Sequence, residues 1–370
     1  MQAAMKKKFI ATILIFSSTA VVILGFSRQF KTVIGTAVQQ HKAADKGLFE
    51  SDEILSVTLS GSIRELLSDR DDNMSLHPVS LSYLKEDGSE MKLAVDMKTR
   101  GHFRRLKENC TYPPLLIQYH KNDTLANTVF REQEKLKLVM PCDGDKYVIR
   151  EWLAYRVYNL VTPKSFRARL VKVKLNDLKS RKEVPEFYSI MIEEEMQMAR
   201  RNSLSSVSRK IIPEQAEREA FLEMAVFQYL IGNTDWSVEY LQNIKLIAND
   251  SLAIPSTVPY DFDHAGIVSA PYAKPAEELN MGSVRERRYR GFCIKELQEY
   301  ESIIGSYLKL KKDIYSIYAD CPLLDEKYKN QAREYLDDFY STISNPKAWN
   351  KDFLYPCNKK GKVVIKGMKD

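Results

Sequence analysis

Four polar side chains in the middle of the chain have the types and spacing that phosphoryl transfer requires. The stretch IGNTDWSVEYLQNIKLI carries Asp235 and, eight residues later, Asn243, and the stretch VPYDFDHAG carries Asp261 and Asp263. Carboxylate and amide groups at strand ends are costly to bury unless they bind something. In kinase-like chemistry one carboxylate orients or deprotonates the hydroxyl nucleophile, while an Asn and a second carboxylate hold a divalent ion on the nucleotide phosphates. Asp235 is thus the candidate catalytic residue, and Asn243 with Asp261, replaced or assisted by Asp263, is the candidate metal site.

These residue types also have an ordinary structural explanation. Asn-x-Asp is a common turn, and carboxylates often cap strand ends. The order of elements favours the functional interpretation, because a helix, an acidic loop, a short strand, a turn and a second strand with an acidic end follow one another. Other chemistries lack their motifs, since the sequence has no H-E-x-x-H and no G-x-S-x-G. His264, beside Asp263, either tunes the site or makes a structural hydrogen bond.

The elements that would position these residues follow from the spacing of apolar residues. Short alternating runs between Val79 and Val139 predict a strand-rich, mostly antiparallel region. A helix at about Val148–Leu160 and two more strand-like runs, FRARLVKVKL and EFYSIMIEE, follow. After Met196 the chain becomes mostly helical. This order predicts an α+β, two-lobed layout, with a small antiparallel-sheet lobe that contains one helix followed by a mostly helical lobe.

Within the second lobe, the clearest helix follows Pro213, where apolar residues recur at helical spacing up to Ile231. Gly232 is well placed to end this helix as its C-terminal cap. Two further helices are expected at 295–318 and 326–343.

Both acidic stretches resemble the catalytic and metal-binding segments of the CotH family of spore-coat kinases and, more distantly, those of HipA-like kinases. Upstream, KTRGHFRR is similar to the Arg-Gly turn early in CotH-like domains, and FYSIMIEE is similar to their strand before the interlobe hinge. The resemblance covers about Leu48 to Tyr340. It implies an atypical protein-kinase-like fold, a bound nucleotide, and ATP with Mg²⁺ or Mn²⁺ as cofactors.

The resemblance also implies a set of nucleotide-binding residues. Lys137 lies 14 residues before Glu151, which suits a strand Lys that contacts the phosphates and pairs with a helix Glu. Lys135, on the same strand face, is the rival to Lys137. Arg100 and Gly101 would form a turn over the phosphates, where the missing side chain of Gly allows close approach of the backbone.

The chain departs from the family pattern around the acidic loop. Leu241 and Gln242 precede Asn243 where relatives often have a His, and Trp236 follows Asp235 where a basic residue is usual. The eight-residue step from Asp235 to Asn243 is longer than that of ordinary protein kinases, which excludes a typical protein-kinase site. A catalytically inactive, pseudokinase-like protein is therefore the alternative to an enzyme.

The N-terminus has the pattern of an export signal or a membrane anchor. A cluster of three Lys, residues 6–8, precedes the uncharged run Phe9–Ser27, so the residues after about Lys31 are expected outside the cytoplasm. An uncleaved segment would make the membrane a partner. The expected organisation is a signal peptide or anchor at 1–31, a linker at 32–52, a sheet-rich lobe at 53–195, a helical lobe at 196–345 and a tail at 346–370.

Charge and cysteine content add two expectations. Residues 1–31 carry five basic residues and no acidic one, which leaves 51 basic against 49 acidic residues in the remainder. The basic balance is thus mostly a targeting feature, and no nucleic-acid partner is indicated. The five Cys residues form no C-x-x-C pair, which disfavours a zinc site. Disulfides Cys110–Cys142 and Cys321–Cys357 are expected if the compartment is oxidising.

Together these features predict an exported protein of the periplasm, the cell envelope or the outer face of the inner membrane. Its expected activity is Mg-ATP-dependent transfer of phosphate to a hydroxyl group of a protein substrate. The alternative is an inactive envelope or surface protein that uses the same fold for binding.

Overall fold

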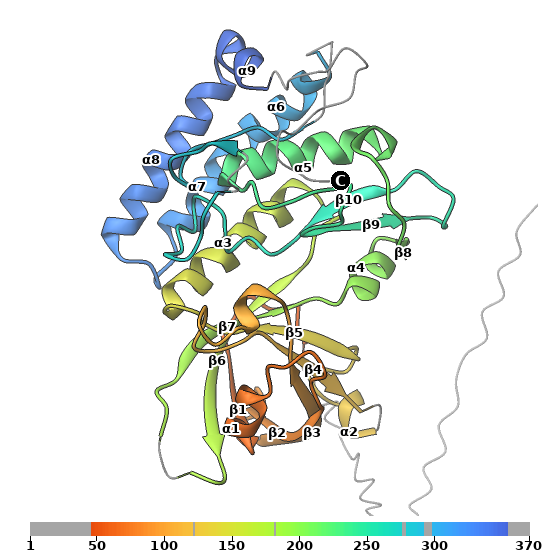
Figure 1. The fold of residues 1–370 in the computed structure, drawn as a ribbon, viewed down its shortest axis with the longest axis vertical. Coiled ribbons are helices and arrows are strands. Elements are labelled where there is room, and N and C mark those ends of the chain that lie inside the picture. The colour runs from red at the N-terminus through yellow and green to blue at the C-terminus, as the bar shows by residue number, and fades with distance from the viewer. Residues whose placement is uncertain (1–45, 121–122, 181–182, 276–278, 292–297, 354–370) are drawn as a thin grey trace, which may run out of the picture. The chain divides into compact units, whose positions relative to one another are not determined.

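The first half of the folded chain is a β-barrel. The computed structural model describes residues 46–120, 123–180, 183–275, 279–291 and 298–353, all within the unit Ala44–Asp370. Seven strands close the barrel in the order β1-β2-β3-β4-β5-β7-β6 (Figure 1). The strands are β1 (Leu55–Gly61), β2 (His77–Leu84), β3 (Glu90–Thr99), β4 (Leu115–Tyr119), β5 (Lys135–Val139), β6 (Ala168–Asp177) and β7 (Phe187–Ile192).

The predicted two-lobed, kinase-like fold with a small antiparallel-sheet lobe is wrong. The strands expected in that lobe form a closed, mixed barrel, because β1 and β6 pair in parallel from Leu55↔Val171 to Gly61↔Asp177. The other neighbouring strands pair antiparallel. Alternation of apolar residues predicts that a strand exists, but not which distant strand it pairs with. The parallel pairing of β1 with β6, which closes the barrel, therefore could not be predicted from the sequence.

The alternation on β5 decides which side chains leave the barrel. Leu136 and Leu138 are buried in the barrel core, whereas Lys135 is exposed and Lys137 is half-buried on the opposite face of the strand. Each fully buried leucine favours this register by about 1.5–3 kcal/mol. Core packing thus fixes Lys137 on the outside of the barrel.

Helix α3 (Asp145–Val161) connects the barrel to the rest of the unit. It packs against β6 and β7 and also against helices α5 (Arg218–Ile231) and α7 (Lys311–Ala319). Glu151 and Tyr155 lie one turn apart on this helix, and both are buried, so they share one face. The predicted helix at Val148–Leu160 is confirmed, although it begins earlier, after Gly144.

A second core forms around α5 (Arg218–Ile231) and a small sheet with the order β10-β9-β8. The Glu217 side chain caps α5 by accepting hydrogen bonds from two backbone N–H groups. Gly232 ends the helix in the left-handed conformation, with φ of 66°, which confirms its predicted role as the cap. The sheet strands are β8 (Ser205–Val207), β9 (Ile244–Ala248) and β10 (Ser256–Pro259).

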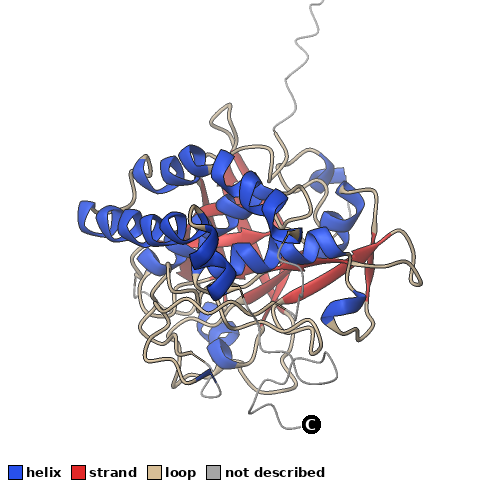
Figure 2. Ribbon diagram, turned by 90° about the horizontal axis from the view of Figure 1, so that it is seen from above, coloured by secondary structure: helices blue, strands red, loops and turns tan. Residues whose placement is uncertain are grey.

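Figure 2 shows that the helices gather over the strands when the chain is seen from above. The segment predicted as one helix at 295–318 contains two, which meet at Leu310, and the helix predicted at 326–343 is confirmed as α8. The remaining helices are α1 (Ile63–Ser68), α2 (Asp123–Ala126), α4 (Glu195–Arg201), α6 (Glu299–Lys309), α7 (Lys311–Ala319), α8 (Glu326–Ile343) and α9 (Pro346–Asp352).

The ends of the chain carry predictions that the fold leaves open. Within the ranges described above, no helix has both the length and the apolar character needed to cross a membrane. The predicted signal or anchor at 1–31 lies outside the described residues. Leu48, in the predicted linker, is buried in the barrel core, and α9 lies in the predicted C-terminal tail. The other segment boundaries remain predictions.

Candidate active site

Four separate parts of the chain bring the predicted site residues together. Lys137 comes from β5 and Glu151 from α3. Asp235 and Asn243 lie at the two ends of the connection between α5 and β9, and Asp261 and Asp263 follow β10. The contacts described below, and the mutual electrostatic influence of these groups, join all of them in one charged cluster.

An ion pair joins the barrel to the acidic segment. The Nζ atom of Lys137 donates to Oδ1 of Asp261 at 2.8 Å, although 124 residues separate the two in sequence. The Lys137 side chain is 12% exposed and that of Asp261 is 29% exposed. Lys137 thus bonds to Asp261 and not to Glu151, the partner expected from the resemblance. Lys135, its rival, is exposed and has no ion pair among the described residues.

Asp261 is held in an unusual backbone conformation. Its φ is 64°, in the left-handed region. This conformation costs a non-glycine residue free energy, and it persists only where the surrounding structure enforces it. Its backbone N–H donates to the hydroxyl of Tyr155 at 2.8 Å, and the next residue, Phe262, is fully buried with its ring centroid 4.6 Å from that of Tyr155. One face of α3 therefore fixes the turn that presents the Asp261 carboxylate.

The Asp235 carboxylate is oriented by amide groups of its own loop. Asn243 donates through Nδ2 to Oδ2 of Asp235 at 3.0 Å and to its backbone oxygen at 2.7 Å, and Gln242 donates to Oδ1. Asn243 also has a positive φ, 53°. Because the Tyr260 N–H donates to the Asn243 carbonyl at 3.0 Å, the Asp235 loop and the Asp261 turn lie side by side.

A buried arginine, Arg104, lies between the two remaining carboxylates. Its Nη1 atom is 3.8 Å from Glu151 Oε2 and 3.5 Å from Asp263 Oδ2, and all three side chains are at most 8% exposed. Nη2 donates to the carbonyl of Met140, and Tyr272 donates its hydroxyl to Asp263 at 3.1 Å. Nε and Nη1 of Arg104 and Oε1 of Glu151 are buried and have no hydrogen-bond partner among the residues that the structure describes.

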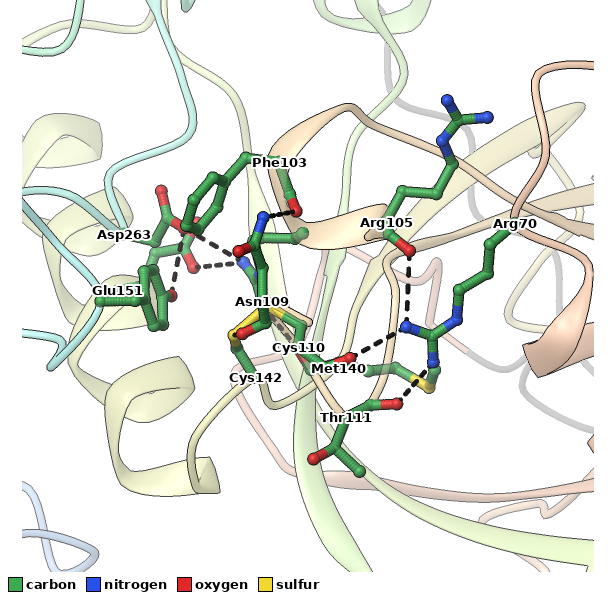
Figure 3. The surroundings of a disulfide bond; sticks show 12 residues. Arg70, Phe103, Arg105, Asn109, Cys110, Thr111, Met140, Cys142, Glu151 and Asp263 are labelled. Atoms are coloured by element: carbon green, nitrogen blue, oxygen red, sulfur yellow. Dashed lines mark hydrogen bonds and ion pairs between the residues drawn. A yellow bond between two sulfur atoms is a disulfide. The ribbon is translucent and has the colours of Figure 1, made fainter. Parts of the chain in front are cut away.

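Arg104 belongs to residues 100–113, which we call the basic loop and which join β3 to β4. A disulfide between Cys110 and Cys142, with a Cα–Cα distance of 4.5 Å, fastens this loop to the segment between β5 and α3, which confirms that predicted pair. Figure 3 shows Glu151 and Asp263 on one side of the disulfide and Arg70 on the other. The second predicted pair stays a prediction, because Cys357 lies outside the described residues; Cys321 is a buried free thiol in the structure.

Arg100 and Gly101 begin the basic loop and face solvent more than Arg104 does. Gly101 has a φ of 87°, and a side chain at this position would meet no other atom within 4 Å, so the backbone here borders open space. The charge of Arg100 acts on both Asp261 and Tyr260. The loop therefore directs one arginine toward the rim of the site and another into its interior.

Burial and mutual repulsion change the acidity of these groups. Burial, and then the charge of Asp263, raise the pKa of Glu151 to about 8, although Arg104 opposes the change. Burial also raises the pKa of Asp235, which the neighbouring Asp263 and Asp261 raise further and His264 lowers. Burial would raise the pKa of Asp261 as well, but Lys137, Arg104 and Arg100 outweigh it, and the pKa is lowered.

The donor set has the chemistry of a site for a hard divalent cation. Asp261, Asp263 and Asn243 offer only oxygen ligands, which Mg²⁺ prefers. Glu151 holds its proton at neutral pH, so three carboxyl groups face two inner cations, Lys137 and Arg104, and the cluster can accommodate further positive charge. Yet each candidate ligand already bonds to a protein group, and in the part of the chain that the structure describes no three acidic, His or Cys residues form a ready metal site. Binding would require Lys137 or Arg104 to share its carboxylate.

Three contributors to the site were not identified from the sequence as members of it. Arg104 lies in the motif KTRGHFRR, where its residue type does not separate it from the basic residues around it. Tyr155 carries a signal that was available, because it follows Glu151 by four residues and so lies on the same helix face. Tyr272 lies in a segment without periodicity, and nothing in the sequence indicates its bond to Asp263.

Comparison with known proteins adds no relative. No protein-family model matches the chain, and no curated protein matches it. The resemblance to the CotH family thus rests on the short motifs alone.

Proposed function

We propose that this chain is a phosphotransferase that moves the terminal phosphate of a nucleotide, ATP with Mg²⁺ or Mn²⁺, to a hydroxyl group of a protein. The observation that carries the proposal is the convergence of Lys137, Asp235, Asn243 and Asp261, joined by the 2.8 Å ion pair between Lys137 and Asp261. Lys137 supplies a cation, Asp235 supplies an oriented carboxylate, and Asn243 and Asp261 supply oxygen ligands. These four residues are distant in sequence but lie in one cluster.

In this proposal each residue has a separate task. Asp235, oriented by Gln242 and Asn243, would accept the proton of the acceptor hydroxyl. The acceptor oxygen would form a bond to the terminal phosphorus, and the bond from that phosphorus to the leaving nucleoside diphosphate would break. The raised pKa of Asp235 suits a general base, because efficiency rises as the pKa approaches the working pH.

The cation side of the site would bind the nucleotide. Lys137 would exchange Asp261 for a phosphate oxygen, and Asp261, freed of Lys137, would hold the metal with Asn243 and Asp263. The bound metal would supply positive charge to the phosphate oxygens. The Cys110–Cys142 disulfide supports the exported location in this proposal, since disulfides persist in oxidising compartments.

The test compares two isosteric variants of the protein comprising residues 40–370. Asp261→Asn should weaken Mg-ATP binding, because a ligand charge is lost, whereas Asp235→Asn should leave binding nearly intact and abolish phosphate transfer to a Ser-containing acceptor or to the protein itself. Binding is read as thermal stabilisation, where ligand at 100 times its dissociation constant adds about 2.7 kcal/mol. Transfer is read with labelled phosphate.

One observation favours the alternative, an inactive protein that uses the site for binding. Both oxygens of Asp235 already accept hydrogen bonds from amide groups, so neither is a free acceptor in this conformation. Nucleotide binding with no phosphate transfer, unchanged by Asp235→Asn, would establish this alternative. Absence of stabilisation by any nucleotide or metal would rule out both functions.

A further inference from the structure

The basic loop of residues 100–113 has almost no regular structure, yet it is tightly fastened. Its helical content is one short turn, η1 (Phe103–Arg105). The Arg70 guanidinium donates to the carbonyls of Cys110 at 2.9 Å and Thr111 at 2.7 Å, as Figure 3 shows in part. The Asn109 side chain donates to the Phe103 carbonyl at 2.8 Å. These bonds fasten the second half of the loop to Arg70 and to the loop's own first half.

Two fasteners hold the loop on the side of the acidic cluster. The Cys110–Cys142 disulfide ties it to the segment that connects Lys137 on β5 with Glu151 on α3. Arg104 reaches the same segment through the Met140 carbonyl, and it continues to Glu151 and Asp263. Both fasteners are buried, since Cys110 is 2% exposed and Arg104 is 7% exposed. Both therefore couple the loop to the elements that carry the proposed site.

We infer that Arg104 and the Cys110–Cys142 disulfide are positioning groups that hold the basic loop over the nucleotide phosphates, with Arg100 and the Gly101 backbone as the contacts. This inference rests on the proposed function. Arg104 itself does not touch the ligand, because its guanidinium is buried against Glu151 and Asp263. Arg104 takes the place of Lys137 beside Glu151, and Lys137 pairs with Asp261 instead, the partner that it would exchange for a phosphate oxygen.

The first arm of the test needs no nucleotide. Hydrogen exchange is measured in the free protein for the amides of residues 100–112 and 260–264. Arg104→Lys keeps the charge but removes the planar fork whose two terminal nitrogens reach Met140 and the two carboxylates, so exchange in both segments should rise about tenfold or more. The double variant Cys110→Ala/Cys142→Ala should raise exchange in the loop in the same way, and reduction of the folded wild-type protein offers a second route if that variant does not fold.

Arg169→Lys is the matched control. Arg169 is as buried as Arg104, and its guanidinium donates to the carbonyls of Leu48 and Glu53, away from the acidic cluster. The same substitution there should leave exchange in both segments at the wild-type level. Equal increases in the Arg104→Lys and Arg169→Lys proteins would mean that Arg104 has a general structural role, and the inference would be overturned.

The second arm measures Mg-ATP affinity by thermal shift in the same proteins. Arg104→Lys and the double cysteine variant should each weaken binding about tenfold, the lower end of what loss of a supporting contact costs a ligand site. Arg100→Ala should also weaken binding, and the combination of Arg104→Lys with Arg100→Ala should weaken binding by less than the two separate losses combined, because Arg104 acts in part through Arg100.

The outcomes separate the inference from the proposed function. A wild-type protein that binds no nucleotide contradicts the proposed function directly, whatever the variants do. Normal ATP binding in wild type together with unchanged affinity in Arg104→Lys contradicts only the inference. Additive losses from Arg100→Ala and Arg104→Lys would contradict it as well, since they would place the two arginines in independent roles.

Discussion

The two sides of the site hold their charged groups in different ways. On the barrel side, the basic loop is irregular and is fixed by a disulfide and by arginines bonded to carbonyl groups. On the acidic side, Asp235 and Asn243 are fixed by hydrogen bonds within their own loop, and the Asp261 turn is fixed by one hydrogen bond to Tyr155 of α3; Asn243 and Asp261 have positive φ. A long loop depends on distant tethers, whereas a short turn carries its geometry locally. Removal of a tether should therefore disturb the whole basic loop, whereas a substitution in an acidic turn should disturb only the structure of that turn.

The largest effect is expected from the tether on the barrel side. Removing the disulfide in Cys110→Ala/Cys142→Ala frees a loop with a sequence separation of 32, which should lower the free energy of unfolding by about 3–4 kcal/mol. Urea denaturation of the oxidised wild type and the variant measures the difference. A loss below about 1 kcal/mol would show that Arg70 and Arg104 fix the loop without it, and would break the comparison.

The next effect concerns Glu151, at the junction of the two sides. Its pKa is raised from the ordinary 4.5 to about 8, first by burial and then by Asp263. Between those pH values the folded protein keeps a proton that the unfolded chain has lost. Stability should therefore fall as pH rises from 5 to 8, by roughly 1 kcal/mol per pH unit.

Glu151→Gln should remove this part of the pH dependence, while Glu326→Gln, at an exposed helix position, should keep the wild-type slope. Denaturation by urea at pH 5, 6.5 and 8 gives the slopes of all three proteins. Identical slopes in wild type and Glu151→Gln would mean that Arg104 keeps Glu151 ionised throughout this range.

The smallest effect is expected from the ion pair that joins the two sides. Lys137→Met leaves Asp261 without its partner, and because both side chains keep some solvent contact the loss should be about 1–2 kcal/mol, less than for a fully buried pair. Lys135→Met, on the same face of β5, should change stability by less than about 0.5 kcal/mol. Equal effects of the two substitutions would indicate that the Lys137–Asp261 pair contributes nothing.

Local signals predicted much of this molecule. The helix that ends at Gly232 follows from apolar spacing and a residue that tolerates positive φ, and the structure has both. The acidic site residues can be predicted from the sequence because their side-chain types and their positions near strand ends follow from it directly. The pair Cys110–Cys142 is also present as predicted.

Long-range pairing is what the sequence did not reveal. The partner of Lys137 lies 124 residues away, and a Glu on the next helix looked equally suitable by charge. Arg104 is one of several arginines near Gly101, and Arg105 is equally buried, so only its contacts with Glu151 and Asp263 distinguish it. The parallel pairing of β1 with β6 closes the barrel, yet an open sheet and a closed barrel share the same alternation of apolar residues.

The parallel seam between β1 and β6 has a consequence for the order in which the chain can fold. Strand β1 begins at Leu55, but its partner across the seam begins only at Ala168, so a chain that emerges from its N-terminus carries an unpaired β1 edge until well over a hundred more residues have followed. Contacts so distant in sequence form slowly, and open strand edges attract other chains. Until β6 has been synthesised, the growing chain therefore exposes an edge of β1 at which other chains can associate.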